Sequence, residues 1–442
     1  MEPSHFESLY PEDTRFSEIK KILEFIKEGN SCQIIGVPGV GRSNLLGLLA
    51  YNKKVKEKHL GENQKWFHFV LLNFSEIKNK TILEVTKFIF LGLLDSLRER
   101  RMDNEYEKIN SFFKESLKAN DELVLFDGLK KAIDFLSIEK EFTVVFLLDR
   151  FEEHIPSLSP DFFSNLRILR NRAKYRFSVV ISSSRPIEDI LEPTFFSDFY
   201  EFTAGKLIYL TLYDRAGMNF RIAYLEKITG KKIKNNIIED VISLTGGHGN
   251  LTRHSLEAVL SVNQKINGEI KEFLLKQMPV RSALFAIWNA LNPDEQTKIS
   301  LLNFGSIDVE FLRKLGLVKD NSLQIPLLRD YLKDSARIRS EETGKIVFDK
   351  NSNQIKKGQV VLSDKLTSSE FKLLKFFILN GNKVVERNEV VSAVWGEMQS
   401  TAGVTEQAID QLISRLRKKI EDNPNSPVYI QTVKGRGFKF TP

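Results

Sequence analysis

The stretch "CQIIGVPGVGRSNLLGLLA", Cys32–Ala50, decides the fold of the first part of the chain. Its opening apolar run, Cys32–Val37, predicts a short buried strand, and the apolar residues that follow Ser43 predict a helix. Between them, glycines let backbone N–H groups converge on an anion at the helix start. A strand, a glycine-rich turn and a helix in this order predict a phosphate-binding unit of an α/β domain.

The turn fits the pattern G-x-x-x-x-G-K-[ST] at every position except the lysine, which is Arg42 here. Arginine keeps the positive charge but replaces a compact ammonium group with a planar fork on a long stem. We therefore expect ATP or ADP to bind here better than it is hydrolysed, with the Ser43 hydroxyl on Mg²⁺. The residues of this turn expected to bind the nucleotide are Gly36, Gly39, Val40, Gly41, Arg42, Ser43 and Asn44.

Three further apolar runs, "WFHFVLLNF", "FTVVFLLD" and "RFSVVISS", alternate with helical segments and predict a parallel sheet covered on both faces. The 442 residues exceed what one core holds, so several domains are expected. They are a P-loop NTPase domain of class α/β (1–205), a helical lid (206–279), a small winged helix (280–335), a charged linker (336–343) and a C-terminal α+β winged helix-turn-helix domain (344–442).

Polar residues follow the later strands at the edge of the sheet where the phosphate loop is expected. Asp149 is the candidate metal ligand, and Glu152 and Glu153 are the candidate catalytic bases. Arg185 follows the next strand, where it could sense a terminal phosphate, and a solvated arginine in an exposed turn is an equal alternative. His248 in "TGGHGN" could close over the nucleotide, or could simply occupy a turn between packed helices.

Together, "GVPGVGRS", "VVFLLDRFEE", "VVISSSRP" and "TGGHGN" resemble the STAND class of P-loop ATPases, signalling relatives of AAA+ proteins. The resemblance covers roughly residues 10–335. It implies a switch whose shape depends on the bound nucleotide, with Asp149, Glu152 and Glu153 in the acidic motif. It also implies nucleotide contacts for Arg185 and for the lid histidine, His248. Arg42 departs from the class, which puts hydrolysis in doubt more than binding.

The last quarter holds nearly all of the excess positive charge, with roughly 16 Lys and Arg against 10 Asp and Glu from Gly344 onward. Its sequence predicts a helix that begins after Thr367, a second near Arg387–Trp395, and a third in "VTEQAIDQLISRLRKKIEDN". The third helix has an apolar face and a polar, cationic face suited to base edges and phosphates. The hairpin "VYIQTVKGRGFKF" follows it.

This segment closely resembles the winged-helix output domain of the OmpR/PhoB response regulators, in "LTSSEFKLL", "VVERNEVVSAVWG", "AIDQLISRLRKKI" and "YIQTVKGRGFKF". The resemblance implies double-stranded DNA as partner. Leu412 and Phe438 stand where many members have histidine and tyrosine. No receiver domain is recognisable; the ATPase module occupies its place. The residues expected to contact DNA are Gln411, Arg415, Arg417, Lys418, Thr432, Lys434 and Arg436.

The amino-acid composition bears on the cellular compartment and on the kinds of partner to expect. A single cysteine, Cys32, excludes an internal disulfide, and no signal peptide is recognisable, so a cytoplasmic protein is expected. Apolar runs stay far below the roughly 20 residues that span a bilayer, so no membrane partner is expected. A second copy of the chain and RNA polymerase stay open as further partners.

The sequence thus favours a nucleotide-gated, sequence-specific DNA-binding protein, a transcriptional regulator with weak or absent ATP hydrolysis. Two alternatives stay open. One is an active ATPase that remodels or loads partners on DNA, and the other is a nucleotide-dead scaffold in host defence.

Overall fold

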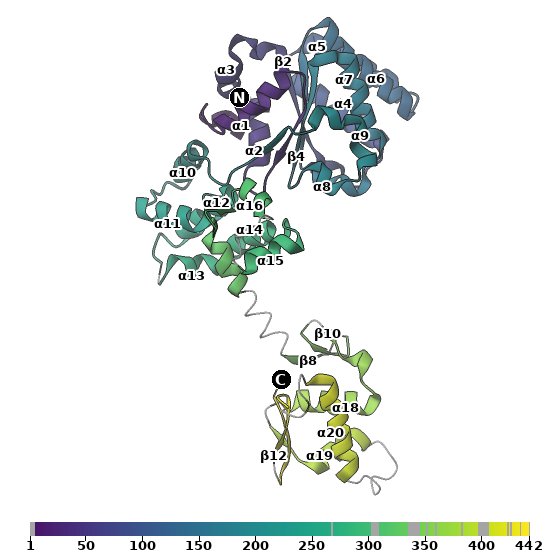
Figure 1. Ribbon diagram of the computed structural model, residues 1–442, viewed down its shortest axis with the longest axis vertical. Helices are drawn as coiled ribbons and strands as arrows, with labels where there is room; N and C mark the ends of the chain where they lie inside the picture. The colour runs from purple at the N-terminus through teal and green to yellow at the C-terminus, as the bar shows by residue number, and fades with distance from the viewer. Residues whose placement is uncertain are drawn as a thin grey trace. The chain divides into compact units, whose positions relative to one another are not determined.

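Apolar runs in the first part of the chain form a parallel sheet. Within the part of the chain that the computed structural model describes, this sheet has five strands in the order β2-β3-β4-β1-β5 (Figure 1). The described residues are 5–266, 268–301, 309–334, 345–350, 352–358, 360–381, 383–396, 406–421, 424, 427–433 and 435–441. The strands are β1 (Cys32–Ile35), β2 (Phe67–Asn73), β3 (Thr143–Asp149), β4 (Phe177–Ser183) and β5 (Leu207–Tyr209).

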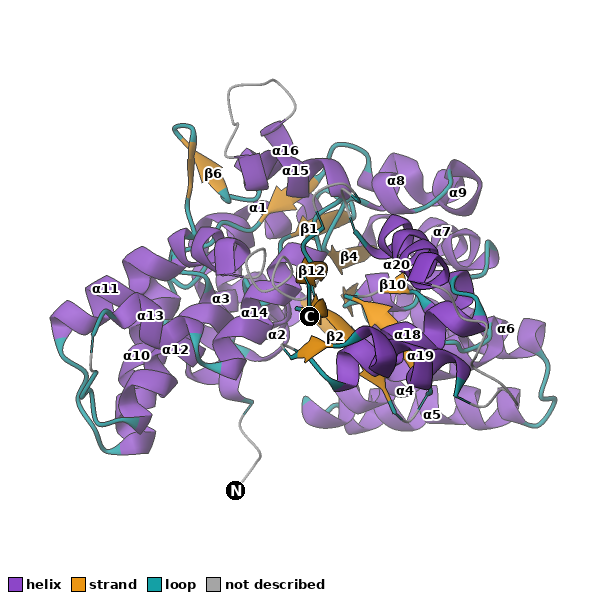
Figure 2. Ribbon diagram, turned by 90° about the horizontal axis from the view of Figure 1, so that it is seen from below, coloured by secondary structure: helices purple, strands orange, loops and turns teal. Residues whose placement is uncertain are grey.

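Helices cover both faces of the sheet, as expected for strands that are apolar throughout. Figures 1 and 2 place α1, α2 and α3 on one side and α4, α7 and α9 on the other. A core of aromatic and aliphatic side chains joins the second group to the strands. The helices are α1 (Phe16–Lys27), α2 (Arg42–Tyr51), α3 (Lys53–Leu60), α4 (Ile82–Glu99), α5 (Asp103–Leu117), α6 (Glu122–Asp134), α7 (Asp161–Ala173), α8 (Ile187–Ile190) and α9 (Pro193–Thr203).

The sheet extends past the boundary that the sequence suggested at residue 205. β5 pairs with β1 in parallel, with Ile34 opposite Ile208, so it belongs to the α/β layer rather than to the helical lid. A strand of three residues is too short to leave a clear apolar run, which is why the sequence pattern stopped at β4. Because β1 pairs with β4 on its other side, the phosphate loop leaves the sheet between two neighbouring strands.

Beyond the sheet, α10 (Arg215–Thr229), α11 (Asn235–Thr245), α12 (Gly249–Ser261) and α13 (Ile270–Leu275) lie together in both views. A smaller group follows, with α14 (Met278–Asn289), α15 (Pro293–Leu301), α16 (Glu310–Lys314) and a hairpin of β6 (Val318–Lys319) and β7 (Ser322–Leu323). The hairpin turns at Asp320 and Asn321, both with positive φ, as a two-residue hairpin turn requires. Residues 1–331 form one unit.

The second unit, 332–442, has its own core and is described by itself. Its strands form two antiparallel sheets, β10-β9-β8 and β11-β13-β12, and its third helix, α20, buries Ile409, Leu412 and Leu416 as the sequence predicts. The linker expected at 336–343 lies outside the described residues. The elements are β8 (Ile346–Asp349), β9 (Gln354–Lys357), β10 (Val360–Val361), α18 (Ser368–Leu379), β11 (Val384–Val385), α19 (Arg387–Trp395), α20 (Glu406–Ile420), β12 (Ile430–Val433) and β13 (Gly437–Phe440).

Candidate nucleotide site and DNA-facing helix

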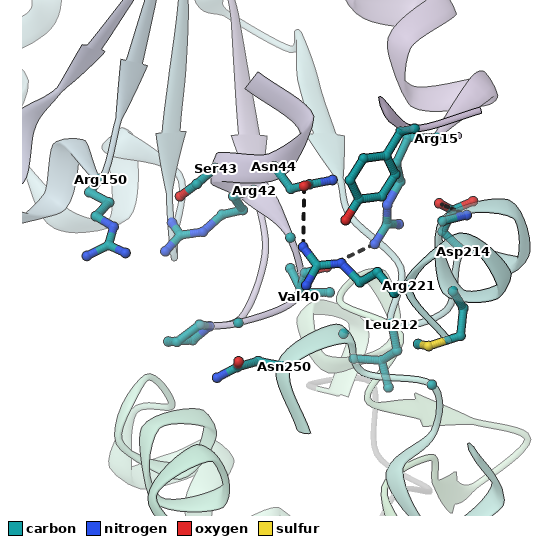
Figure 3. A pocket seen from close by; sticks show the side chains of 18 of the residues that line it. Arg15, Val40, Arg42, Ser43, Asn44, Arg150, Leu212, Asp214, Arg221 and Asn250 are labelled. Atoms are coloured by element: carbon teal, nitrogen blue, oxygen red, sulfur yellow. Dashed lines mark hydrogen bonds between the residues drawn. The ribbon is translucent and has the colours of Figure 1, made fainter. Parts of the chain in front are cut away.

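A cavity of about 570 Å³ lies against the loop between β1 and α2 (Figure 3). Its size falls within the range of small-molecule and cofactor sites. The lining comes from the phosphate loop, from the segment after β3, from the N-terminal segment and from the lid. Among the residues expected at the site, those that line the cavity are Gly39, Val40, Gly41, Arg42, Ser43, Asn44, Glu152 and Glu153.

The loop keeps its carbonyl groups occupied outside the cavity. The carbonyl of Pro38 hydrogen-bonds His248 Nε2 at 2.9 Å, and the carbonyl of Gly39 accepts from the N–H of Asn250 at 3.0 Å. The carbonyl of Val40 accepts from Arg15 Nη2 at 3.0 Å. Gly41 precedes helix α2 as its N-cap, with a φ of 112° that suits glycine, and the N–H groups of the first turn of α2 have no intrahelical acceptor. Donors rather than acceptors are therefore available to a phosphate here.

Arg42 is bound to the acid that the sequence suggests as catalytic base. Its Nη2 donates to Glu152 Oε1 at 2.6 Å, and both side chains are mostly covered, with 11% and 24% of their surfaces exposed. Arg42 Nη1 and Glu152 Oε2 are buried without a hydrogen-bond partner in the described part of the chain. Because a buried, unpartnered polar atom costs about 1–3 kcal/mol, this pair is incompletely satisfied as it stands.

The other acids are arranged differently. Glu153 forms ion pairs with Lys78 and, at 3.7 Å, with Arg150. Asp149 is buried at the end of β3 and accepts at Oδ1 from the Arg150 N–H, at 3.0 Å, and from Ser182 Oγ, at 3.4 Å.

The oxygen atoms present suit Mg²⁺, which takes one or two carboxylates together with phosphate oxygens and water. Asp149, one expected metal ligand, is buried at the end of β3 and is not among the residues that line the cavity. Ser43, the other expected metal ligand, is exposed within the lining. The described residues contain no cluster of three or more His, Cys, Asp or Glu that could hold a metal ion.

Three residues expected to touch the nucleotide do not line the cavity. Gly36 is buried beneath Val40, so its backbone supports the turn from below. Arg185 forms an ion pair with Glu295 of α15 and lies 4.8 Å from the ring centroid of Phe311. Its guanidinium is thus paired with an acid of the small helical group.

His248 is the third residue outside the lining, and it holds the lid to the loop. It is fully buried, and its Nδ1 accepts from the Leu251 N–H at 3.2 Å while Nε2 faces the Pro38 carbonyl. Both ring nitrogens are therefore used by backbone groups in the neutral ring. Burial, above all, lowers the pKa of His248 to about 4. Adjacent Gly247, Gly249 and Asn250 line the cavity in its place.

Sequence patterns missed the far wall of the cavity. Arg15, nearly buried, donates to Thr211 O at 2.9 Å as well as to the loop, and Arg221 of α10 donates to Asn44 Oδ1 at 3.3 Å (Figure 3). These arginines belong to no phosphate-loop motif: Arg15 lies 25 residues from Val40 in the sequence, and Arg221 lies 177 residues from Asn44. Their neighbours in the lining are Tyr10, Leu212, Asp214, Gly217 and Met218.

In the second unit, α20 exposes polar side chains opposite its buried face. Arg415 is exposed, whereas Arg417 is half-buried and donates to the Ile430 carbonyl at 2.7 Å and to Thr432 Oγ1 at 2.9 Å. Arg417 therefore joins the helix to the hairpin β12–β13. Lys434 lies outside the described residues. The remaining residues expected on DNA are exposed, namely Gln411, Lys418 and Arg436, as is Thr432 itself.

Strand order, loop and cavity define the class of the first unit, a P-loop NTPase-like α/β core. Residues 363–440 match the family described as "Transcriptional regulatory protein, C terminal". The C-terminal part is thus an OmpR/PhoB-type winged-helix DNA-binding domain. Over the stretches that the structure describes, every helix is too short or too polar to traverse a bilayer.

Several proteins, transcriptional regulators among them, are similar to part of this chain. Protein PetR of Rhodobacter capsulatus is 30% identical over 101 residues, which cover 22% of this chain and 42% of PetR. Two further regulators, ycf27 of Cyanidium caldarium and YrkP of Bacillus subtilis, are each 32% identical over 109 and 120 residues. The chain spans half or less of the length of these three relatives.

Among solved structures, the RstA DNA-binding domain of Klebsiella pneumoniae, in complex with the RstA box, is 24% identical with a TM-score of 0.20. The match covers 22% of this chain and 93% of the RstA chain. The Walker-type ATPase paby2304 of Pyrococcus abyssi is 16% identical with a TM-score of 0.43, over 80% of this chain and 94% of its own.

The buried His248 makes a prediction about stability and pH. Because its pKa is lowered in the folded protein, the unfolded chain binds more protons between about pH 4 and 6.5. This contribution to stability is therefore complete above pH 6.5 and is lost as the pH falls toward 4. In His248→Asn, the free energy of unfolding should rise less steeply over this window, by up to about 1.4 kcal/mol per pH unit.

Denaturant titrations of the full chain at pH 4.5, 5.5 and 6.5 measure this slope, with His254→Asn on the same helix as the matched control. Parallel slopes for wild type and His248→Asn would contradict the neutral, loop-binding role of His248.

Proposed function

We propose that the protein is a sequence-specific DNA-binding transcriptional regulator whose DNA affinity or assembly depends on an adenine nucleotide bound in the cavity of the first unit. The observation that carries the proposal is the Arg42–Glu152 pair, which holds one unpartnered donor and one unpartnered acceptor at the cavity wall. The winged-helix domain would bind DNA and so exert the regulatory effect. The exposed residues of α20 and its hairpin would contact the duplex.

A phosphate would compete with Glu152 for Arg42. Its oxygens could accept from both terminal nitrogens of the guanidinium, including the unpartnered Nη1, whereas Glu152 accepts from Nη2 alone in this arrangement. A phosphate beside an intact Glu152 carboxylate would also place two negative charges together. Nucleotide binding would therefore move Arg42 toward the phosphate and lengthen its bond to Glu152, which would remain beside the guanidinium.

The same pair accounts for weak or absent hydrolysis. A base that activates water needs a free carboxylate oxygen aimed at that water. Here Glu152 accepts from Arg42, and one guanidinium has to serve both the acid and the phosphate. Ser43 and Asp149 would hold Mg²⁺, which neutralises phosphate charge when bound, while Glu152 would stay close to its cation.

Contacts between the loop and the lid would make the position of the lid depend on whether a nucleotide is bound. Asn250 and His248 bind the loop backbone, and Arg221 reaches Asn44 across the cavity. A nucleotide would touch both the loop and the lid, so it could favour one lid position over another by the difference in its contacts. This is the switch behaviour that the STAND resemblance implies.

One observation favours the alternative of an active ATPase that remodels or loads partners on DNA. Glu153 lines the cavity, and its partners are Lys78 and Arg150 rather than Arg42. Glu153 is therefore a second acid at the cavity that is not paired with Arg42.

The first prediction concerns nucleotide binding. Glu152→Gln removes the charge that competes for Arg42, so ADP should bind about tenfold more tightly than to wild type. Calorimetry of the full chain measures this, with Glu62→Gln, an exposed acid of the same unit, as control. Weaker binding by Glu152→Gln, or wild-type ATP turnover that this substitution abolishes, would favour the active ATPase instead.

The second prediction tests the gating itself. A target duplex is first selected from a random DNA pool with the full chain. Its affinity with ATP, with ADP and without nucleotide should then differ by at least about fivefold between two of the three states. Equal affinities in all three would refute gating, whereas failure to select any sequence would refute specific DNA binding.

The third prediction separates base contacts from phosphate contacts. Arg415→Ala should weaken binding to the selected duplex by about 1–3 kcal/mol and relax its preference over random DNA. Arg436→Ala, at the hairpin tip, should lower affinity for both duplexes alike. The same loss on selected and random DNA for Arg415→Ala would exclude a base contact by Arg415.

A further inference from the structure

A second and larger cavity lies at the outer edge of the sheet, away from the phosphate loop. Its volume is about 930 Å³. β2 is the end strand of the sheet, so one long side of this strand has no neighbouring strand in the described structure. The cavity runs along β2 and is closed by α3, α4 and the last residues of α2, Ala50 and Tyr51.

Two cations stand at this cavity without an acidic partner. Lys56 Nζ donates to the Ala50 carbonyl at 2.7 Å, and Arg100 Nη1 donates to the Phe67 carbonyl at 2.7 Å. Within the residues that the structure describes, neither side chain forms an ion pair. Three acids also line the cavity: Asp95 lies 3.3 Å from Arg98, Glu99 lies 3.4 Å from the His5 ring, and Glu76 lies just past the end of β2.

A buried chain of hydrogen bonds orients the guanidinium of Arg100. Ser96 Oγ donates to the Leu93 carbonyl at 2.7 Å, so it accepts from His68 Nε2 at 2.9 Å. His68 Nδ1 is therefore the acceptor of the bond from Arg100 Nη1 at 2.9 Å. His68 is fully buried and neutral, because burial and the two nearby cations hold its pKa well below the usual value. The ring serves as a fixed support for Arg100.

The lowered pKa of Lys56 is consistent with a cation that has no acidic partner. Burial first, and Arg100 second, lower the pKa of Lys56 to about 8. A carboxylate nearby would have the opposite effect. Two like charges held close together in a partly enclosed space favour the binding of an anion that carries more than one negative charge.

The other walls are apolar. Lys56 Nζ lies 5.7 Å from the ring centroid of Phe69, and Leu71, Phe88 and Leu91 also line the cavity. Leu91 is 47% exposed, which leaves an apolar surface open to a ligand. At the rim, the rings of Tyr51 and His5 stack at 3.5 Å.

We propose that this cavity is a second ligand site, in which Lys56 and Arg100 bind the phosphate group of a small organic phosphate monoester whose apolar body lies against β2 and α4. A phosphate monoester carries a charge of about −1.5 to −2 at neutral pH, which matches the two cations better than a single carboxylate does. The site does not depend on the proposed function. The two cavities share one helix: the first turn of α2 lines the nucleotide cavity, and its last turn lines this one.

Pyridoxal 5′-phosphate is a suitable probe because it joins a phosphate and an aromatic ring to an aldehyde. The aldehyde condenses with an amine, with loss of water, and borohydride reduces the imine to a stable adduct that mass spectrometry maps. The nucleotide cavity has no lysine in its lining, so an adduct at Lys56 reports the second cavity alone. Lys53 and Lys54, exposed on the same helix, are internal controls.

In the full chain at pH 7.5, Lys56 should be modified at least about tenfold faster than Lys53 or Lys54, since more of its amine is neutral. Phenyl phosphate should suppress this modification, benzoate should do so less, and phenol should not. Arg100→Met should weaken the protection by phenyl phosphate about tenfold. Lys54→Met should leave it unchanged.

Equal modification of Lys56 and the two exposed lysines in the wild type would overturn the proposal, and this result needs no variant. Protection by phenol as strong as that by phenyl phosphate would overturn the phosphate assignment. Protection by benzoate as strong as that by phenyl phosphate would contradict the preference for a dianion.

Discussion

One guanidinium group, that of Arg42, is expected to bind a phosphate and already forms an ion pair with an acid. Arg42 stands at the position of a phosphate-loop lysine, and its Nη2 is bound to Glu152 at 2.6 Å. A compact ammonium group in the same place would lie close to the loop, whereas the longer, planar arginine spans the distance to the segment after β3. The residue expected to hold a phosphate and the residue expected to activate water are thereby joined. The account of binding, slow hydrolysis and switching depends on this pair.

The loop is prepared for an anion by contacts made outside the cavity. Arg15, His248 and Asn250 bind three successive carbonyl groups of the loop, from residues 38, 39 and 40. Two of these partners come from the lid side, at the start of α12, and one from the N-terminal segment. Loop shape and lid position are therefore linked by the same hydrogen bonds. A change in either one alters the other.

The sequence allowed the strands β1 to β4 to be predicted because each is a continuous apolar run. It did not show β5, which is too short, nor the partners of Arg185 and His248. Arg185 meets Glu295, 110 residues further along the chain, and no local pattern predicts that contact. Arg15 and Arg221 lie outside every motif and became visible only when the fold brought them to the loop. The C-terminal domain was recognisable as a whole, because its motifs occur in order and at fixed spacing.

A crystal structure of the full chain with ADP and Mg²⁺ tests the central claim most directly, through the distance between Arg42 and Glu152. The account predicts the guanidinium on a phosphate oxygen and its bond to Glu152 lengthened beyond 2.6 Å, with Glu152 still beside it. Bound ADP above an unchanged Arg42–Glu152 ion pair would contradict it.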